Sequence, residues 1–146
     1  MAEVFLTLHV LAAVLAIGPI AVAGSLFPRY ASRDHEEGRD SSASGLLHRI
    51  CRGYAFAGLA IPVFGLVTGA LLGVLAQAWL IASIILTALA AALLVLGILP
   101  SQSRLLAGPA AGEETGPAVS RLHMLTGFFN LLWAVVVVLM VVRPGA

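Results

Sequence analysis

Three long stretches without a charged residue constrain this chain more than any other feature of its sequence. They cover residues 4–28, 53–103 and 122–142. About 20 apolar residues are enough to cross the roughly 30 Å hydrocarbon core of a bilayer as a helix. The second stretch is about twice as long as one such helix, so it predicts a hairpin of two spans. The chain is therefore expected to cross a membrane four times.

Composition indicates the same class of protein. Of the 146 residues, 60% are hydrophobic and only 10% are charged. This balance excludes an ordinary soluble enzyme and a disordered chain. The formal net charge is +1, so the chain has no basic field for a polyanion and no nucleic-acid partner is expected. The single cysteine, Cys51, excludes an internal disulfide and a multi-cysteine zinc site.

We therefore predict an all-α polytopic membrane protein, with one four-helix up-down domain over residues 1–146. Every span should be helical, because a backbone in contact with lipid must satisfy its own N–H and C=O groups. The valine run at residues 135–138 does not alternate in polarity as a membrane β-strand would. The expected spans are residues 3–28, 46–76, 78–99 and 118–143, with loops on one side at 29–45 and 100–117.

Glycine and proline mark the ends and bends of these spans. The hairpin turn is expected between Gly73 and Trp79, with the tryptophan at the membrane interface. The third span should stop before Pro100, which cannot continue a helix well. Residues 115–117, Thr-Gly-Pro, predict the start of the fourth helix. Pro62 should bend the second span.

The distribution of basic residues predicts the orientation in the membrane. All eight are arginine, and seven of them lie in or beside the first and third loops, whereas Arg143 lies on the other side. Cytoplasmic loops carry an excess of basic residues. We expect a multi-pass protein of the inner (plasma) membrane, surrounded by membrane lipids. Loops 1 and 3 would be cytoplasmic and both termini outside.

A glycine row on the second span predicts close helix packing. Gly65, Gly69 and Gly73 recur at four-residue spacing and so share one face of the helix. Small residues let helices approach closely in lipid, so this face should contact a neighbouring helix of this chain or of a partner. Asn130, near the middle of the fourth span, should hydrogen-bond a hydroxyl or a backbone carbonyl across an interface.

Three histidines are candidate ligands for haem b or copper. His9 lies roughly 9 Å along the helix axis from the outer end, and His123 roughly 3 Å from the inner end. These two should therefore not ligate one iron. His48 and His123 have similar depths, so a bis-histidine haem or a copper site between the second and fourth spans is conceivable. For His9, a hydrogen bond to a neighbouring helix is favoured over ligation.

The spans lack the residues that membrane catalysis and ion coupling need. They contain no carboxylate or lysine for a proton relay, and no nucleophile lies beside a base. This disfavours an ion-coupled transporter and favours a protein that is not an enzyme. The leading hypothesis is a non-catalytic accessory or scaffold subunit that packs against other membrane subunits, for example in a respiratory assembly, or against itself. The alternative is a haem- or copper-binding protein that uses His48 with His123, or His9 with an unidentified ligand.

Two segments carry a family resemblance. Residues 8–19 read Leu-His-Val-Leu-Ala-Ala-Val-Leu-Ala-Ile-Gly-Pro, with a histidine before small residues. The second segment reads Gly-Phe-Phe-Asn-Leu-Leu-Trp at residues 127–133 and ends in Met-Val-Val-Arg-Pro at residues 140–144. Both resemble small bacterial four-helix membrane proteins of unknown function that border the copper-resistance D-like group. The arginine-only, alanine- and glycine-rich composition also resembles that of actinobacterial proteins. The resemblance implies the four-span layout over most of the chain.

A second, more limited resemblance involves the first span. His9 and the Pro-Arg exit at residues 28–29 resemble the four-helix membrane protoporphyrinogen oxidase, which implies an oxidase activity as a third hypothesis. Here His9 stands about one helical turn farther from the exit than in that pattern, and the third span contains no lysine.

Overall fold

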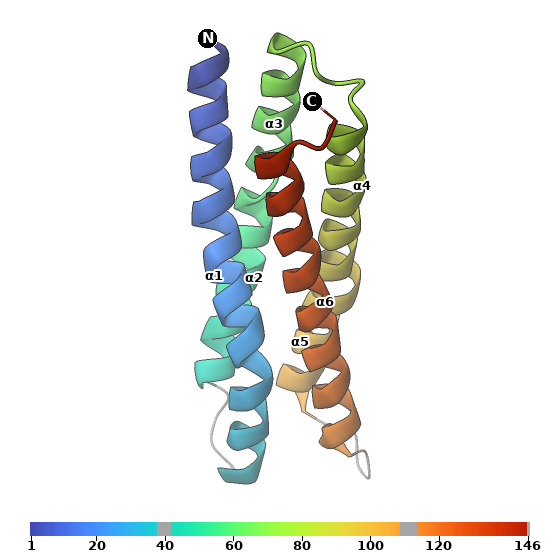
Figure 1. Ribbon diagram of the computed structural model, residues 1–146. Coiled ribbons are helices and arrows are strands. Elements are labelled where there is room, and N and C mark those ends of the chain that lie inside the picture. Colours follow the sequence, from blue (N-terminus) through green and yellow to red (C-terminus); the bar gives the residue numbers. More distant parts are fainter. Residues whose placement is uncertain (38–41, 109–113, 146) are drawn as a thin grey trace.

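The computed structural model describes residues 1–37, 42–108 and 114–145. Within this part, four helical stretches are long and apolar enough to cross a membrane, namely Ala2–Arg33, Ala43–Leu71, Ala78–Ala107 and Thr115–Val142. Figure 1 shows them side by side as an up-down bundle, with both termini at the end that holds the hairpin between the second and third spans. The predicted all-α, four-span fold is confirmed.

Some spans are assembled from shorter helical elements. The first is α1, Ala2–Glu37, and the second consists of α2, Ser42–Ala57, and α3, Ala60–Leu71. The third span contains α4 (Ala78–Ala92), the π-helical η1 (Leu93–Ile98) and α5 (Leu99–Ala107). The fourth span is α6 (Thr115–Val142). The first span contacts the second and the fourth, because α1 packs against α2, α3 and α6. The fourth span contacts all parts of the third, because α6 packs against α4, η1 and α5. α2 also packs against α5, so the spans enclose one core.

The tightly packed core lies toward the end of the bundle where α1 and α5 end and α2 and α6 begin. We call this the arginine end. Phe27 of α1 and Leu122 of α6 are fully buried there, and Ile98 of η1 is 1% exposed. Lipid tails are as apolar as these side chains, so their contribution comes from close packing rather than from removal from water.

Pro62 interrupts the second span, as its sequence position predicted. Proline has no N–H, and its ring clashes with the carbonyl four residues earlier, which here belongs to Gly58. Gly58 and Leu59 form a turn between α2 and α3, and the Ile61 N–H donates to the Gly58 carbonyl at 3.1 Å. The break divides the second span into α2 and α3.

The hairpin between α3 and α4 occurs where it was predicted. Gly73 has φ +69°, a left-handed conformation that glycine adopts without a Cβ penalty. α4 begins at Ala78, and the Trp79 indole N–H donates to the Gln77 side-chain oxygen. The Arg143 guanidinium, just beyond α6, lies 5.7 Å from the centre of the Trp79 ring, which ties the end of the fourth span to the hairpin.

Three helix ends differ from the sequence-based expectation, and one of them is the end of the second span, which was expected at residue 76 but lies at Leu71. A loop was expected from residue 29, but α1 continues to Glu37. Arg29 marks the edge of the hydrocarbon core, but the helix can continue beyond that edge because its backbone hydrogen bonds also form in the headgroup layer and in water. The third span was expected to stop before Pro100, but α5 continues to Ala107. Pro100 falls in the first turn of α5, directly after the π-helical η1, where a missing N–H breaks no α-helical bond.

Candidate functional site

Three polar side chains inside the bundle, His9, Asn130 and His48, form hydrogen bonds between spans, each at a different level. One level lies near the termini, one near the middle of the spans and one at the arginine end. Each joins two different spans, and each involves a residue that the sequence had marked as a candidate site. The three levels decide which of those candidates remain available for a ligand.

His9 forms the level nearest the termini, between α1 and α3. Its Nδ1–H donates to the backbone carbonyl of Ile61 at 2.8 Å. The ring also lies against Gly65, because a Cβ placed there would be only 2.8 Å from the His9 Cε1 atom. The favoured expectation, a hydrogen bond from His9 to a neighbouring helix, is confirmed. In this tautomer Nε2 carries the lone pair, and no described residue is hydrogen-bonded to it.

Asn130 forms the middle level, between α6 and α1. Its side-chain N–H donates to the Ser25 hydroxyl at 3.1 Å, which is the kind of partner that the sequence predicted. Three buried polar atoms on the same side of α6 have no hydrogen-bond partner in the described structure. They are the side-chain oxygens of Asn130 and Thr126 and the indole nitrogen of Trp133. The single hydrogen bond to Ser25 therefore satisfies only part of this interface.

His48 forms the level at the arginine end, between α2 and α5. Its Nδ1–H donates to the Gln102 side-chain oxygen at 2.9 Å, and the Ser103 hydroxyl lies 3.4 Å from Nε2. Gln102 is fully buried and its amide N–H contacts the sulfur of Cys51 at 3.6 Å. Cys51 is also fully buried. Both ring nitrogens of His48 thus have partners on α5.

No hydrogen bond joins any two of the candidate haem ligands in the described structure. His123 is exposed and has no hydrogen bond in the described part of the chain. His48 directs its nitrogens to α5 and His9 contacts α3, so no two of these imidazoles share a partner. The described residues also include no group of three or more His, Cys, Asp or Glu that could hold a metal ion.

The glycine row divides into three different roles. Gly65 accommodates the His9 ring, and a Cβ at Gly69 would lie 3.0 Å from the side chains of Leu75 and Leu80. A Cβ at Gly73, by contrast, would meet no atom within 4 Å, and this glycine serves the hairpin turn through its positive φ. The row thus packs within the chain at its first two positions, and at its third it provides backbone freedom.

Two open grooves lie on the outside of the bundle. The first has a volume of about 430 Å³ and is lined by Leu89, Ala92, Leu93, Leu96, Gly97 and Leu132. It runs along α4 and η1 beside α6 and is almost wholly apolar. The second, of about 410 Å³, lies on α2 and is lined by Arg49, Ile50, Gly53, Tyr54 and Ala57.

Sequence reasoning missed two residues that build the polar levels, Gln102 and Ser25. Gln102 lay in what was expected to be a loop, because the third span was ended at Pro100. The Ser-Gln-Ser run at 101–103, directly after an apolar span, was a usable signal. Ser25 gave none, since a single serine in a span most often bonds its own helix.

The comparison with known families bears on the whole bundle. A family model described as "Predicted integral membrane protein (DUF2269)" matches residues 3–144, from α1 to the residues just beyond α6. The chain belongs to the DUF2269 family. No curated protein and no solved structure matches it. Membership in DUF2269 confirms the resemblance to small membrane proteins of unknown function, and with the four apolar helices it identifies a multi-pass integral membrane protein.

Proposed function

We propose that this DUF2269 chain is a non-catalytic membrane subunit that packs against the transmembrane helices of other subunits, as in a respiratory assembly. The observation that carries the proposal is the apolar groove of α4, η1 and α6. Leu96 in this groove is 76% exposed. Gly97 and Ala92 keep side chains short along it. Grooves of this kind let a second helix approach closely in lipid, where small residues mark interfaces.

The π-helical η1 explains why the groove is there. A π turn carries one residue more than an α turn, so it shifts the faces of the helix that follow it. Leu94 and Ile98 then point into the core, with exposures of 5% and 1%, while Leu96 and Val95 are left on the outside. Insertions of this type occur often at functional sites, and here the function that fits an apolar groove is helix packing.

The polar levels inside the bundle also support a non-catalytic role. His9, His48 and Asn130 are three of the side chains that could bind a ligand or move a proton. Each one donates a hydrogen bond to another span of the same chain. Such bonds orient helices relative to one another, which is what a scaffold subunit requires.

We further propose that the arginine end faces the cytoplasm in the plasma membrane. Seven arginines lie in the sequence next to this end, against Arg143 at the other. An excess of basic residues marks the cytoplasmic side of short loops. Both termini, which lie together at the opposite end (Figure 1), would then be outside.

Photo-cross-linking in native membranes tests the subunit role. A benzophenone side chain replaces Leu96 in the groove, and a matched control replaces Val22, which is 60% exposed on α1. The two sites have similar depth, because Val22 precedes Arg29 by seven positions and Leu96 precedes Arg104 by eight. We expect one discrete protein adduct from Leu96 and only lipid adducts from Val22.

A pair of phenylalanine variants tests whether the Leu96 cross-link depends on the groove. Ala92→Phe fills the groove, and Ala91→Phe adds the same ring one position away, at a residue that does not line it. Ala92→Phe should reduce the Leu96 adduct severalfold, whereas Ala91→Phe should leave it unchanged. Equal yields from both variants, or lipid adducts alone at Leu96, would contradict the proposal. An adduct of two copies of this chain would replace the accessory subunit by a self-associating one.

One observation favours the haem- or copper-binding alternative through His9. Histidines that bind metals usually donate their other ring N–H to a carbonyl or carboxylate, and His9 donates Nδ1–H to the Ile61 carbonyl. The visible absorption spectrum of the purified protein distinguishes the two functions. A haem Soret band that disappears in His9→Ala would favour the alternative, and a featureless spectrum together with the Leu96 adduct would favour the subunit.

A further inference from the structure

We propose that the groove on α2 is a binding site for an anionic phospholipid, whose phosphate lies at Arg49 and whose acyl chain lies over Gly53 and Ala57. The groove is separate from the apolar groove of α4, η1 and α6. Its lining residues all come from α2. The argument rests on the charge of Arg49, on its depth in the membrane and on the shape of the helix surface.

The charge at the groove has no partner among the side chains that the structure describes. Arg49 is exposed, and it makes no hydrogen bond or ion pair with the residues whose side chains the structure describes, which leaves out residues 34–42. Arg52, three positions further along α2, is likewise exposed and without such a partner among the described residues. A guanidinium binds phosphate oxygens with two parallel N–H···O bonds. An anionic headgroup is therefore the complementary ligand.

The depth of Arg49 matches the phosphate layer. The helical stretch 43–71 has 29 residues, so it is about 43 Å long and exceeds the roughly 30 Å hydrocarbon core. If its far end lies at the opposite edge of the hydrocarbon, Arg49 falls at the level of the headgroups. Tyr54 lies five residues deeper, about 7 Å along the axis. Its hydroxyl is then placed at the boundary where tyrosine is enriched.

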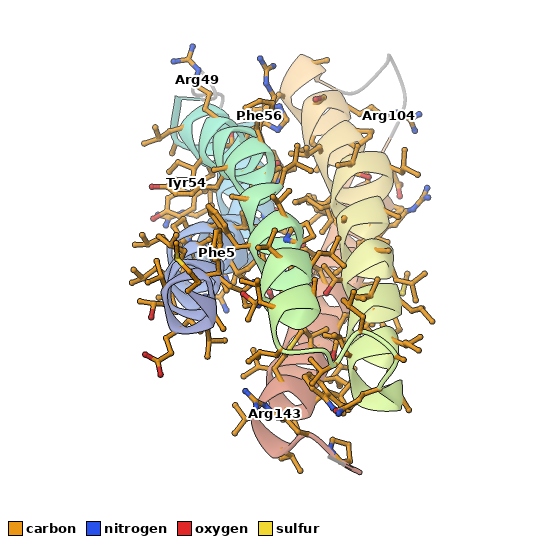
Figure 2. The ribbon with its side chains drawn as sticks, turned by 90° about the horizontal axis from the view of Figure 1, so that it is seen from above. Phe5, Arg49, Tyr54, Phe56, Arg104 and Arg143 are labelled. Atoms are coloured by element: carbon orange, nitrogen blue, oxygen red, sulfur yellow. The ribbon has the colours of Figure 1, made fainter. Side chains whose placement is uncertain are left out.

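The helix surface below Arg49 is low enough to hold an acyl chain. A Cβ at Gly53 would meet nothing within 4 Å, and Ala57 continues the same row one turn deeper. Tyr54 forms the side of the groove and is 39% exposed. Figure 2 shows Arg49 and Tyr54 on the α2 side of the molecule and Arg104 on the α5 side.

Arg49 also decides between a lipid and a partner helix as the occupant. Gly45, Arg49, Gly53 and Ala57 recur at four-residue spacing, so the arginine interrupts a row of small residues. A helix that packed closely along this row would remove the guanidinium from water without neutralising it, which is costly. A phospholipid with a negative headgroup neutralises the charge and fills the groove with a flexible chain.

Native mass spectrometry of the purified full chain tests the site. The probe is dioleoyl-phosphatidylglycerol, and dioleoyl-phosphatidylcholine has the same acyl chains without the net charge. Arg49→Gln should weaken phosphatidylglycerol binding roughly fivefold, the contribution of one basic side chain at an anionic surface. Arg49→Lys should retain most of the preference. Arg104→Gln is the matched control, because Arg104 is also exposed and unpartnered in the described structure.

Further variants and competitors in the same measurement distinguish a bound phospholipid from other occupants of the groove. Gly53→Leu keeps the charge but fills the groove, and it should weaken binding of both lipids. Equal losses in Arg49→Gln and Arg104→Gln would overturn the proposal, as would equal binding of the two lipids to the wild type. Complete displacement by inorganic phosphate would also overturn it, because the site would then recognise a free anion. Unchanged binding in both Arg49→Gln and Gly53→Leu would do the same.

Discussion

Replacing Gly65 by leucine is expected to destabilise the bundle by about 3 kcal/mol, the upper range for forcing a larger side chain into a packed site. A Cβ at this position lies 2.8 Å from Cε1 and 3.0 Å from Nδ1 of His9. The ring cannot move aside freely, because its Nδ1–H is bonded to the Ile61 carbonyl. The free energy of unfolding in mixed micelles, followed by circular dichroism, measures the effect.

The control for this change is Gly53→Leu, in which the same side chain is added where no atom lies within 4 Å of the new Cβ. Its free energy of unfolding should stay within about 0.5 kcal/mol of the wild type. The double variant His9→Ala with Gly65→Leu should recover much of the lost stability, since the clash partner is gone. Equal effects of the two leucine substitutions, or strictly additive effects of the His9 and Gly65 changes, would refute the contact.

Gln102→Ala is expected to cost about 2–3 kcal/mol of unfolding free energy. The change leaves a cavity at a fully buried position. It also removes the acceptor of the half-buried His48 Nδ1–H, which adds part of the cost of an unsatisfied donor. The contact between α2 and α5 would then lose both hydrogen bonds that the Gln102 side chain makes, to His48 and to Cys51.

Ser103→Ala is the matched control for Gln102→Ala. It also removes a contact to His48, but the Ser103 hydroxyl is exposed and lies 3.4 Å from Nε2, a long hydrogen bond. We expect a change below about 0.5 kcal/mol. If thermal unfolding in detergent gave the two variants the same midpoint, the Gln102 network would not be holding α2 against α5.

The fold could be predicted from the sequence because charge and hydropathy act over whole segments. The uncharged stretches located all four spans, and Pro62 and Gly73 located a break and a turn. The prediction that the third span stops before Pro100 was wrong, because the effect of a proline depends on the helical turn before it. A π turn leaves no α-helical bond for proline to break, and no residue pattern of 93–98 indicates that geometry.

The candidate site was only partly predictable, because hydropathy does not report how a helix is rotated. α6 is apolar on nearly all sides, so its sequence did not indicate which face meets α1. Asn130 was identified because an amide near the middle of a span must find a partner. The pairing of His48 with Gln102 depends on the register between α2 and α5, which the sequence of either helix alone does not contain.

The placement of the spans in the membrane underlies every functional proposal made for this chain, and cysteine labelling tests it most directly. In a Cys51→Ala background, single cysteines replace Ala76 in the hairpin and Glu114 before α6, both of which are exposed. A membrane-impermeant maleimide should label the Ala76 position on intact cells and the Glu114 position only after permeabilisation. Labelling of both positions on intact cells, or of the Glu114 position alone, would contradict the four-span arrangement with a cytoplasmic arginine end.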